Sequence, residues 1–211
     1  MGRIALISRL KQKMYDARDN SLLLLEKIRG IDIRKPEIIE EVHQDQTQNF
    51  PYMAPGEQIL KKVFRTLPIT SDDAILDCGC GKGGVLVTLS KYPFRKLGGV
   101  ELSPKLYAIA QNNMARLQIR HAELFCCDAA EFTALDDYTY LYFFNPFSHI
   151  VMEAVMKNVI ESLQSRPRKL TIICIHPVCH DTILQTGVFV KTAEFERRDH
   201  ISCFVYQYTQ A

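Results

Sequence analysis

Carboxylate side chains stand at the ends of three short apolar segments, and an amide stands at the end of a fourth. They belong to Asp77, Glu101, Asp128 and Asn145. Clustered carboxylates repel one another, so a sheet with a purely structural role has no need of acids at three successive strand ends. Carboxylate and amide oxygens accept hydrogen bonds from amines and from sugar hydroxyl groups. The four residues therefore predict a binding site for a polar ligand.

A glycine-rich turn follows Asp77 and is the most specific motif of the chain. Residues 79–84 read GCGKGG, with four glycines in six positions. Glycine adopts positive φ and lets a ligand approach the backbone closely, at a cost in backbone entropy that a plain connection does not require. The apolar residues 74–76 predict a buried strand before the turn, and residues 85–89 predict a helix after it. Strand, turn and helix together predict a nucleotide-binding edge.

Two classes of cofactor fit this turn. Residues 79–84 satisfy G-x-G-x-x-G, the dinucleotide fingerprint. The Asp77 carboxylate would repel a pyrophosphate at the helix N-terminus, whereas it would attract a cation. S-adenosylmethionine (SAM) carries an ammonium and a sulfonium group and has no phosphate. The sequence therefore favours SAM over NAD, and a structural turn without a ligand is the third alternative.

Residues 77–83, DCGCGKG, resemble the first motif of class I SAM-dependent methyltransferases, D/E-x-G-x-G-x-G. The resemblance extends from about Tyr52 to the C-terminus. It implies that Glu101 accepts from the ribose hydroxyl groups and that Asp128 accepts from the adenine amine. The residues expected to bind the cofactor are Asp77, Gly79, Cys80, Gly81, Gly83, Glu101, Leu102, Cys127, Asp128, Ala129 and Asn145.

The segment Asn145-Pro146-Phe147 resembles the N/D-P-P-Y/F motif of amino-group methyltransferases. In that motif the asparagine side chain and a backbone carbonyl hold the amine, and the aromatic ring stacks on the substrate. Here one proline, instead of two, separates the asparagine from the aromatic residue. The resemblance assigns the catalytic role to these three residues and makes Tyr52 a candidate to line the methyl-donor site, with a packing aromatic as the alternative for Tyr52. An Asx-Pro turn with Phe147 in the core is the alternative interpretation.

Apolar runs alternate with amphipathic segments along the rest of the chain. Strands are predicted at residues 74–76, 96–101, 122–127, 139–144, 170–175, 188–190 and 201–208, and helices at residues 56–67, 104–117 and 149–163. This alternation is typical of an α/β fold, a doubly wound sheet with helices on both faces. The resemblance specifies a seven-stranded, mostly parallel sheet. Ligands of such sheets bind at the carboxyl ends of the strands.

The first fifty residues match no family pattern and predict a separate helical segment. Ile4, Ile7, Leu10 and Met14 recur at helical spacing between basic residues. We expect a helical extension or lid at residues 1–50, followed by the SAM-binding domain at residues 51–211. A basic amphipathic helix also suits a membrane surface or nucleic acid. Packing over the core domain, or on a second subunit in a dimer, is the favoured interpretation.

Composition bounds the partners of the chain. The formal net charge of its 211 residues is only +2, which does not favour nucleic acid as the main partner. No apolar run approaches membrane-spanning length. The seven cysteines are interpreted as reduced thiols, which predicts a cytoplasmic protein. The expected methyl acceptor is a small molecule or a protein side chain, with nitrogen favoured over oxygen, and an RNA or DNA base is the alternative.

Two further interpretations concern metal binding and catalysis. Cys174, His176, Cys179 and His180 cluster in the sequence, but their spacing matches no zinc module, so no metal site is predicted. His176 follows the fifth predicted strand and is a candidate general base, although a histidine at such a position is more often structural. Because no strong catalytic base is visible, a non-catalytic nucleotide-binding module is the rival functional hypothesis.

Overall fold

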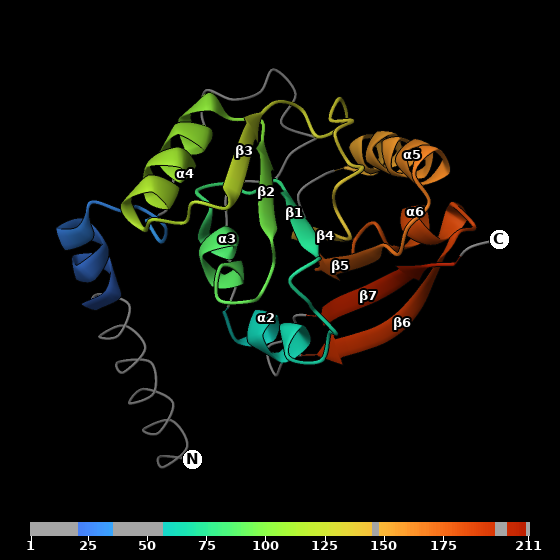
Figure 1. Ribbon diagram of the computed structural model, residues 1–211, viewed down its shortest axis with the longest axis horizontal. Helices are drawn as coiled ribbons and strands as arrows, with labels where there is room; N and C mark the ends of the chain where they lie inside the picture. The colour runs from blue at the N-terminus through green and yellow to red at the C-terminus, as the bar shows by residue number, and fades with distance from the viewer. Residues whose placement is uncertain (1–20, 36–56, 145–147, 197–201, 210–211) are drawn as a thin grey trace, which may run out of the picture.

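The computed structural model describes residues 21–35, 57–144, 148–196 and 202–209 (Figure 1). The strands are β1 (Ala74–Cys78), β2 (Lys96–Glu101), β3 (Ala122–Cys126), β4 (Tyr140–Phe144), β5 (Thr171–Ile175), β6 (Phe189–Glu196) and β7 (Ser202–Tyr208). The helices are α2 (Glu57–Phe64), α3 (Gly84–Leu89), α4 (Pro104–Arg116), α5 (His149–Ser165) and α6 (His180–Gln185), and residues 21–29 form a further helical segment.

All seven strands form one sheet in the order β3-β2-β1-β4-β5-β7-β6. Strands β1 to β5 pair in parallel, whereas β7 runs antiparallel to both β5 and β6. The strand order reverses between β1 and β4, because the chain first winds outward to β3 and then returns to β4. The predicted doubly wound, seven-stranded and mostly parallel sheet is therefore confirmed. Its carboxyl edge at the switch point is the expected place for a ligand.

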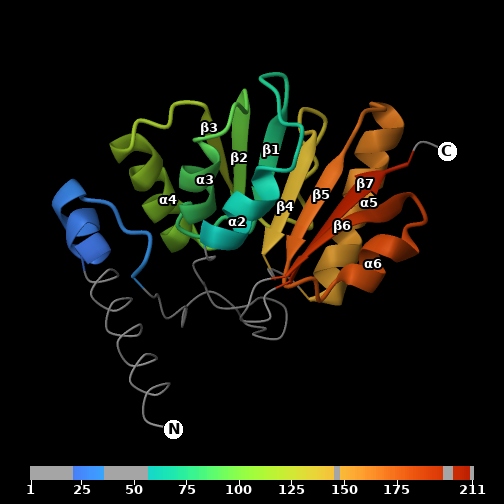
Figure 2. The same cartoon turned by 90° about the horizontal axis from the view of Figure 1, so that it is seen from below.

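Two helical layers cover the sheet, with α2, α3 and α4 on one side and α5 and α6 on the other (Figures 1 and 2). Successive side chains of a strand point to opposite faces. Leu76 and Leu141 accordingly belong to the apolar cluster that includes α5, and Ile75 and Tyr142 belong to the cluster that includes α2 and α3. The strands in the middle of the sheet are thus buried on both faces, as parallel strands usually are.

Two details differ from the prediction. Helix α6 was not predicted, because it has only six residues and no side-chain cap. Strand β6 continues beyond Val190 to Glu196. This extension was not predicted, because many of its side chains are polar and exposed and it has no apolar run. Residues 127–139, between β3 and β4, contain no helix.

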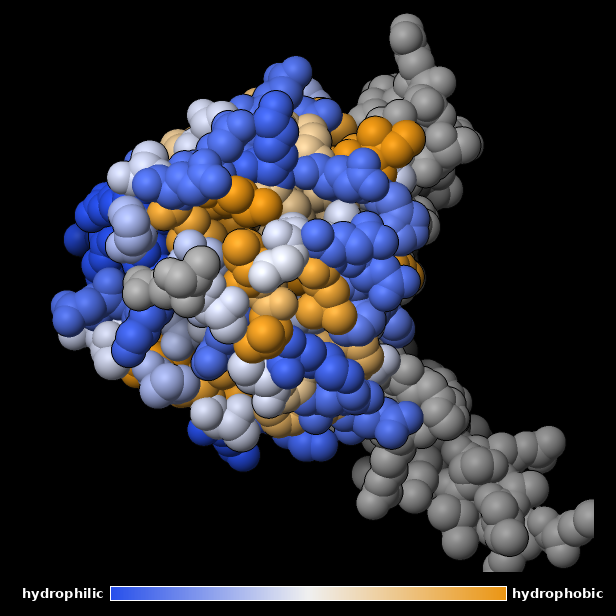
Figure 3. Space-filling model, turned by 90° about the vertical axis from the view of Figure 1, so that its right-hand side faces the viewer, coloured by the Kyte–Doolittle hydropathy of each residue, from blue (hydrophilic) through white to orange (hydrophobic). Residues whose placement is uncertain are grey.

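Apolar residues show between polar ones on the face that carries α6 and β6 (Figure 3), where Leu184 and Val190 are exposed.

The helical segment at residues 21–29 lies on the outer side of α4 (Figure 1). Its buried side chain is that of Glu26, which accepts hydrogen bonds from the backbone N–H groups of Ile33 and Arg34, both at 3.1 Å. Large apolar side chains of the same segment are exposed, and Ile28 is 72% exposed. The predicted division into residues 1–50 and 51–211 stays a prediction.

Candidate cofactor site

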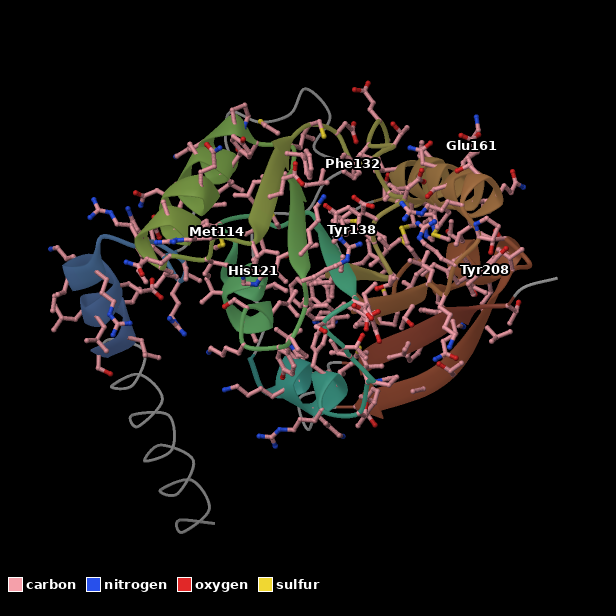
Figure 4. All side chains as sticks on the ribbon, viewed as in Figure 1. Met114, His121, Phe132, Tyr138, Glu161 and Tyr208 are labelled. Carbon is pink, nitrogen blue, oxygen red and sulfur yellow. The ribbon has the colours of Figure 1, made fainter. Side chains whose placement is uncertain are left out.

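The glycine turn has the backbone geometry that its sequence predicts. Gly79, Gly81 and Gly83 all have positive φ, at 91°, 54° and 79°. A Cβ atom at Gly83 would lie 2.9 Å from the terminal methyl carbon of Met114, which α4 directs toward α3 (Figure 4). The N–H groups of Gly79 and Cys80 both donate to the carbonyl oxygen of Val100 at 2.9 Å. The turn is therefore tied to the end of β2 and requires glycine for its shape.

Asp77 is the most unusual polar residue of the site. It is 1% exposed, and its Oδ2 atom has no hydrogen-bond partner in the part of the chain that the structure describes. Burial, and after it the negative charge of Glu101, raise the pKa of Asp77 well above its ordinary value. A buried carboxyl group without a hydrogen-bond partner lowers the stability of the fold. The position is suited to a ligand that brings a positive charge and hydrogen-bond donors.

Glu101 connects the turn to the following strand ends. Its Oε2 atom accepts from the N–H of Gly81 at 2.8 Å, and its Oε1 atom accepts from the N–H of Ser103 at 2.9 Å. Ser103 in turn caps α4, because its Oγ atom accepts from the N–H of Leu106. The N–H of Cys127 donates to the Glu101 carbonyl oxygen at 3.2 Å. The structure thus brings the ends of β1, β2 and β3 together, as predicted.

The residues expected around the adenine lie just beyond β2 and β3. Leu102 and Cys127 are half-buried, and Ala129 is buried. Asp128 follows the carboxyl end of β3, and its Oδ1 atom accepts from the N–H of Ala130 at 2.8 Å. This hydrogen bond orients the Asp128 carboxylate in the loop. The contacts of these residues with adenine stay a prediction.

The predicted catalytic residues Asn145, Pro146, Phe147 and Tyr52 lie outside the described residues, and their roles stay predictions. Phe144 ends β4 directly before them. Its ring lies 5.6 Å, centroid to centroid, from the imidazole of His176, which follows β5.

His176 has a φ of 50°, which is uncommon for a residue with a side chain and recurs at functional sites. Because His176 directly follows the last residue of β5, this candidate base stands at the carboxyl edge of the sheet. In the described ranges no three His, Cys, Asp or Glu side chains gather in the manner of metal ligands. Burial raises the pKa of Cys78, Cys80 and Cys174, so these thiols stay protonated.

Lys82 and Asn113 belong to the site but were missed by the sequence interpretation. Lys82 is fully buried, and its ammonium group donates to Asp32 Oδ1 at 2.8 Å and to the Lys35 carbonyl oxygen at 2.7 Å. The Asn113 amide donates to the carbonyl oxygens of Asp32 and Lys82 and accepts from the Asp32 N–H. Residues 30–35 are thereby fastened to the glycine turn. The one sequence feature that pointed to this structural role was a lysine within a turn of small residues.

A comparison with known families agrees with this geometry. Residues 75–166 match the family model described as a methyltransferase domain, and this stretch includes the glycine turn, Glu101 and Asp128. Residues 75–166, less than half of the chain, are therefore a methyltransferase domain, on a sheet of the Rossmann-like order described above. The predicted family and the choice of SAM over NAD as its cofactor are confirmed.

Solved methyltransferases share the fold. A putative methyltransferase from Escherichia coli superposes with a TM-score of 0.57 at 18% identity, covering 75% of this chain and 92% of that one. An RNA methyltransferase from Salinibacter ruber, solved with S-adenosyl-L-homocysteine, superposes with a TM-score of 0.58 at 11% identity, covering 75% and 95%. At such identities the likeness shows the fold alone.

Two curated relatives match shorter stretches. An uncharacterized RNA methyltransferase from Chlamydia muridarum is 34% identical over 82 residues, which are 39% of this chain and 20% of that protein. A protein-lysine N-methyltransferase from Saccharolobus islandicus is 27% identical over 67 residues, which are 31% and 42%. The chain therefore spans a fifth of the first relative's length and less than half of the second's. Among the described residues, no helix is both long and apolar enough to cross a membrane.

Proposed function

We propose that the chain transfers the methyl group of SAM to a nitrogen atom of a protein side chain or a small molecule. The observation that carries the proposal is the buried Asp77 carboxyl group, whose Oδ2 atom lacks a partner in the described part of the chain. A cationic amine removes the cost of burying this acid by pairing with it. The ammonium group of SAM is such a cation.

The neighbouring groups fit the rest of the cofactor. The Glu101 carboxylate accepts from two backbone N–H groups, and a carboxylate at this strand end suits the ribose hydroxyl groups of the cofactor. Asp128 and Ala129 stand at the end of the next strand, where they would meet the adenine edge. The glycines at 79, 81 and 83 keep side chains away from the ligand's path.

Bound SAM would supply an electrophilic methyl group on a sulfonium. The chain then has to align the acceptor with the bond that breaks and to exclude water. We assign the holding of the acceptor to Asn145, Pro146 and Phe147, with Tyr52 beside the methyl donor. A protonated amine must lose its proton before it attacks. His176, packed edge-on against Phe144 at the same sheet edge, is the described side chain to which we assign that proton.

The acceptor class rests on two supports. The segment at residues 145–147 resembles a motif that holds amino groups, and one curated relative is named a protein-lysine N-methyltransferase. A nucleic-acid base is the second candidate, because the other curated relative is named an RNA methyltransferase. In that case Phe147 would stack on a base that has left its helix, and basic residues near the N-terminus would contact phosphates.

Isothermal titration of the full chain with SAM, S-adenosylhomocysteine and NAD tests the cofactor. We expect binding of the first two and none of NAD, and binding of NAD alone would contradict the proposal. Transfer of a labelled methyl group to cell extracts then tests the acceptor. Label removed by protease or found in small molecules supports the first candidate, and label removed by nuclease supports the second. SAM binding without label in any fraction indicates the non-catalytic module.

A further inference from the structure

A second buried polar group stands beside Asp77. Tyr142 of β4 is the direct partner of Asp77 of β1 in the parallel register. Paired residues of neighbouring strands direct their side chains to the same face of the sheet, and the strands lie about 4.8 Å apart. Gly99, the partner of Asp77 on β2, has no side chain. Among the residues that β2 and β4 place opposite Asp77, Tyr142 is therefore the one whose side chain stands on the same face of the sheet.

The Tyr142 hydroxyl group has no evident structural purpose. Tyr142 is 0% exposed, and its hydroxyl oxygen has no hydrogen-bond partner among the residues that the structure describes. An unpaired buried hydroxyl group destabilises a fold, so packing alone would favour phenylalanine here. The next residues of β4, Phe143 and Phe144, are phenylalanines. Asp77 Oδ2 also has no partner in the described ranges, so the two neighbouring strands each carry a buried polar atom to which no described residue is hydrogen-bonded.

The electrostatics indicate how the two groups differ in their roles. Burial and the charge of Asp77 raise the pKa of Tyr142 well above its ordinary value, so the phenol keeps its proton and stays a donor. Burial and Glu101 raise the pKa of Asp77, so without a cation its carboxyl group is a weak acceptor. A bound ammonium group favours the ionised carboxylate, and a carboxylate accepts much stronger hydrogen bonds than a carboxylic acid.

We propose that Tyr142 is a positioning residue for the cofactor, because its hydroxyl group donates to the Asp77 carboxylate, directly or through one water, when the ammonium group is bound. This inference rests on the proposed SAM binding at Asp77. Tyr142 acts through Asp77 and does not touch the reacting atoms. The hydroxyl group, which has no partner among the described residues, thus gains one in the complex.

Tyr142→Phe removes one oxygen atom and tests the inference in the full chain. We expect the free variant to be as stable as the wild type or more stable, because an unpaired hydroxyl group is gone. We expect its SAM affinity, measured by isothermal titration at about pH 8, to fall about tenfold, as for a lost hydrogen bond to a charged group. The pH at which SAM binding weakens should also move upward, because the Asp77 carboxylate loses a stabilising donor.

Tyr138→Phe is the matched control. The Tyr138 hydroxyl group is also buried and unpaired in the described chain, but it belongs to the cluster on the opposite face of the sheet, beside Gly98. Figure 4 labels Tyr138. This variant should gain as much stability as Tyr142→Phe and leave the affinity for SAM and its pH dependence unchanged.

A double-mutant cycle with Asp77→Asn separates the positioning role from packing. If Tyr142 acts through Asp77, Tyr142→Phe should have little further effect on SAM affinity in the Asp77→Asn background. Unchanged affinity and pH dependence in Tyr142→Phe, independent effects of the two substitutions, or loss of folding in Tyr142→Phe would each overturn the inference. If the wild type binds SAM and Asp77→Asn weakens it, the proposed function stands whatever Tyr142→Phe does.

Discussion

Asp77→Asn should change the stability of the free protein and its affinity for SAM in opposite directions. In the fold, burial and then Glu101 raise the pKa of Asp77 above 3.8, the ordinary value that applies to the unfolded chain. Between these two pKa values the folded state binds a proton that the unfolded chain has released. The free energy of unfolding therefore falls by up to about 1.4 kcal/mol for each unit of pH increase in that window.

The sign of this effect follows from the direction of the shift. The stability contributed by protonated Asp77 is fully present below about pH 3.8 and is lost as the pH rises toward the raised pKa of the folded state. Asparagine has nearly the same size and does not titrate. The stability of Asp77→Asn relative to the wild type should thus increase with pH across the window. SAM affinity should fall about 10- to 100-fold, because a hydrogen bond to a charged partner is lost.

Urea unfolding of both proteins at a series of pH values, followed by circular dichroism without SAM, measures the first effect. Isothermal titration with SAM measures the second. Parallel stability profiles would refute the claim that burial holds Asp77 protonated. Equal SAM affinities would refute its assignment to the ammonium group. A loss of stability at every pH would indicate that Asp77 supports the fold through a contact that asparagine cannot make.

Three further predictions follow from the site. Gly83→Ala should lower the free energy of unfolding by about 1–2 kcal/mol, because alanine at positive φ is strained, and should weaken SAM binding in the same titration. Asn113→Ala should lower the free energy of unfolding in urea by about 2–3 kcal/mol, because it removes the hydrogen bonds of the buried Asn113 amide to the half-buried backbone of residue 32 and the buried carbonyl oxygen of residue 82, whereas Asn112→Ala, at the exposed neighbouring position, should lower it by less than about 0.5 kcal/mol. A thiol reagent at about pH 8 should label the exposed Cys126 quickly and Cys203, whose pKa burial raises to about 12, only after unfolding, as peptide mass spectrometry would show.

The parts of the molecule that were predictable are those determined by local sequence. The strand before the glycine turn, the turn itself and the acid that ends β2 each have a local pattern, and the structure contains all three. The edge of the sheet was less predictable. Strand β6 alternates polar side chains with half-buried ones beyond Val190, so it lacks the apolar run by which the inner strands were found.

The buried polar residues were the least predictable part of the site, because their partners are distant in sequence. Lys82 pairs with Asp32, fifty positions away, and Asn113 joins the same two segments from α4. Tyr142 is read from the sequence as one more aromatic residue of an apolar strand. Its position beside Asp77 becomes visible only when the pairing of β1 with β4 is known.

Buried polar residues also explain how the glycine turn keeps one fixed shape. Glycines with positive φ have a large backbone entropy in the unfolded chain, which opposes a fixed turn. Glu101 holds the turn from β2 by accepting from Gly81, and Lys82 and Asn113 hold it from the other side through residues 30–35. These hydrogen bonds come from the side chains of Glu101, Asn113 and Lys82, so the turn is fixed although four of its six residues are glycines. The backbone of the turn is thereby fixed from both sides, next to the buried Asp77 carboxyl group.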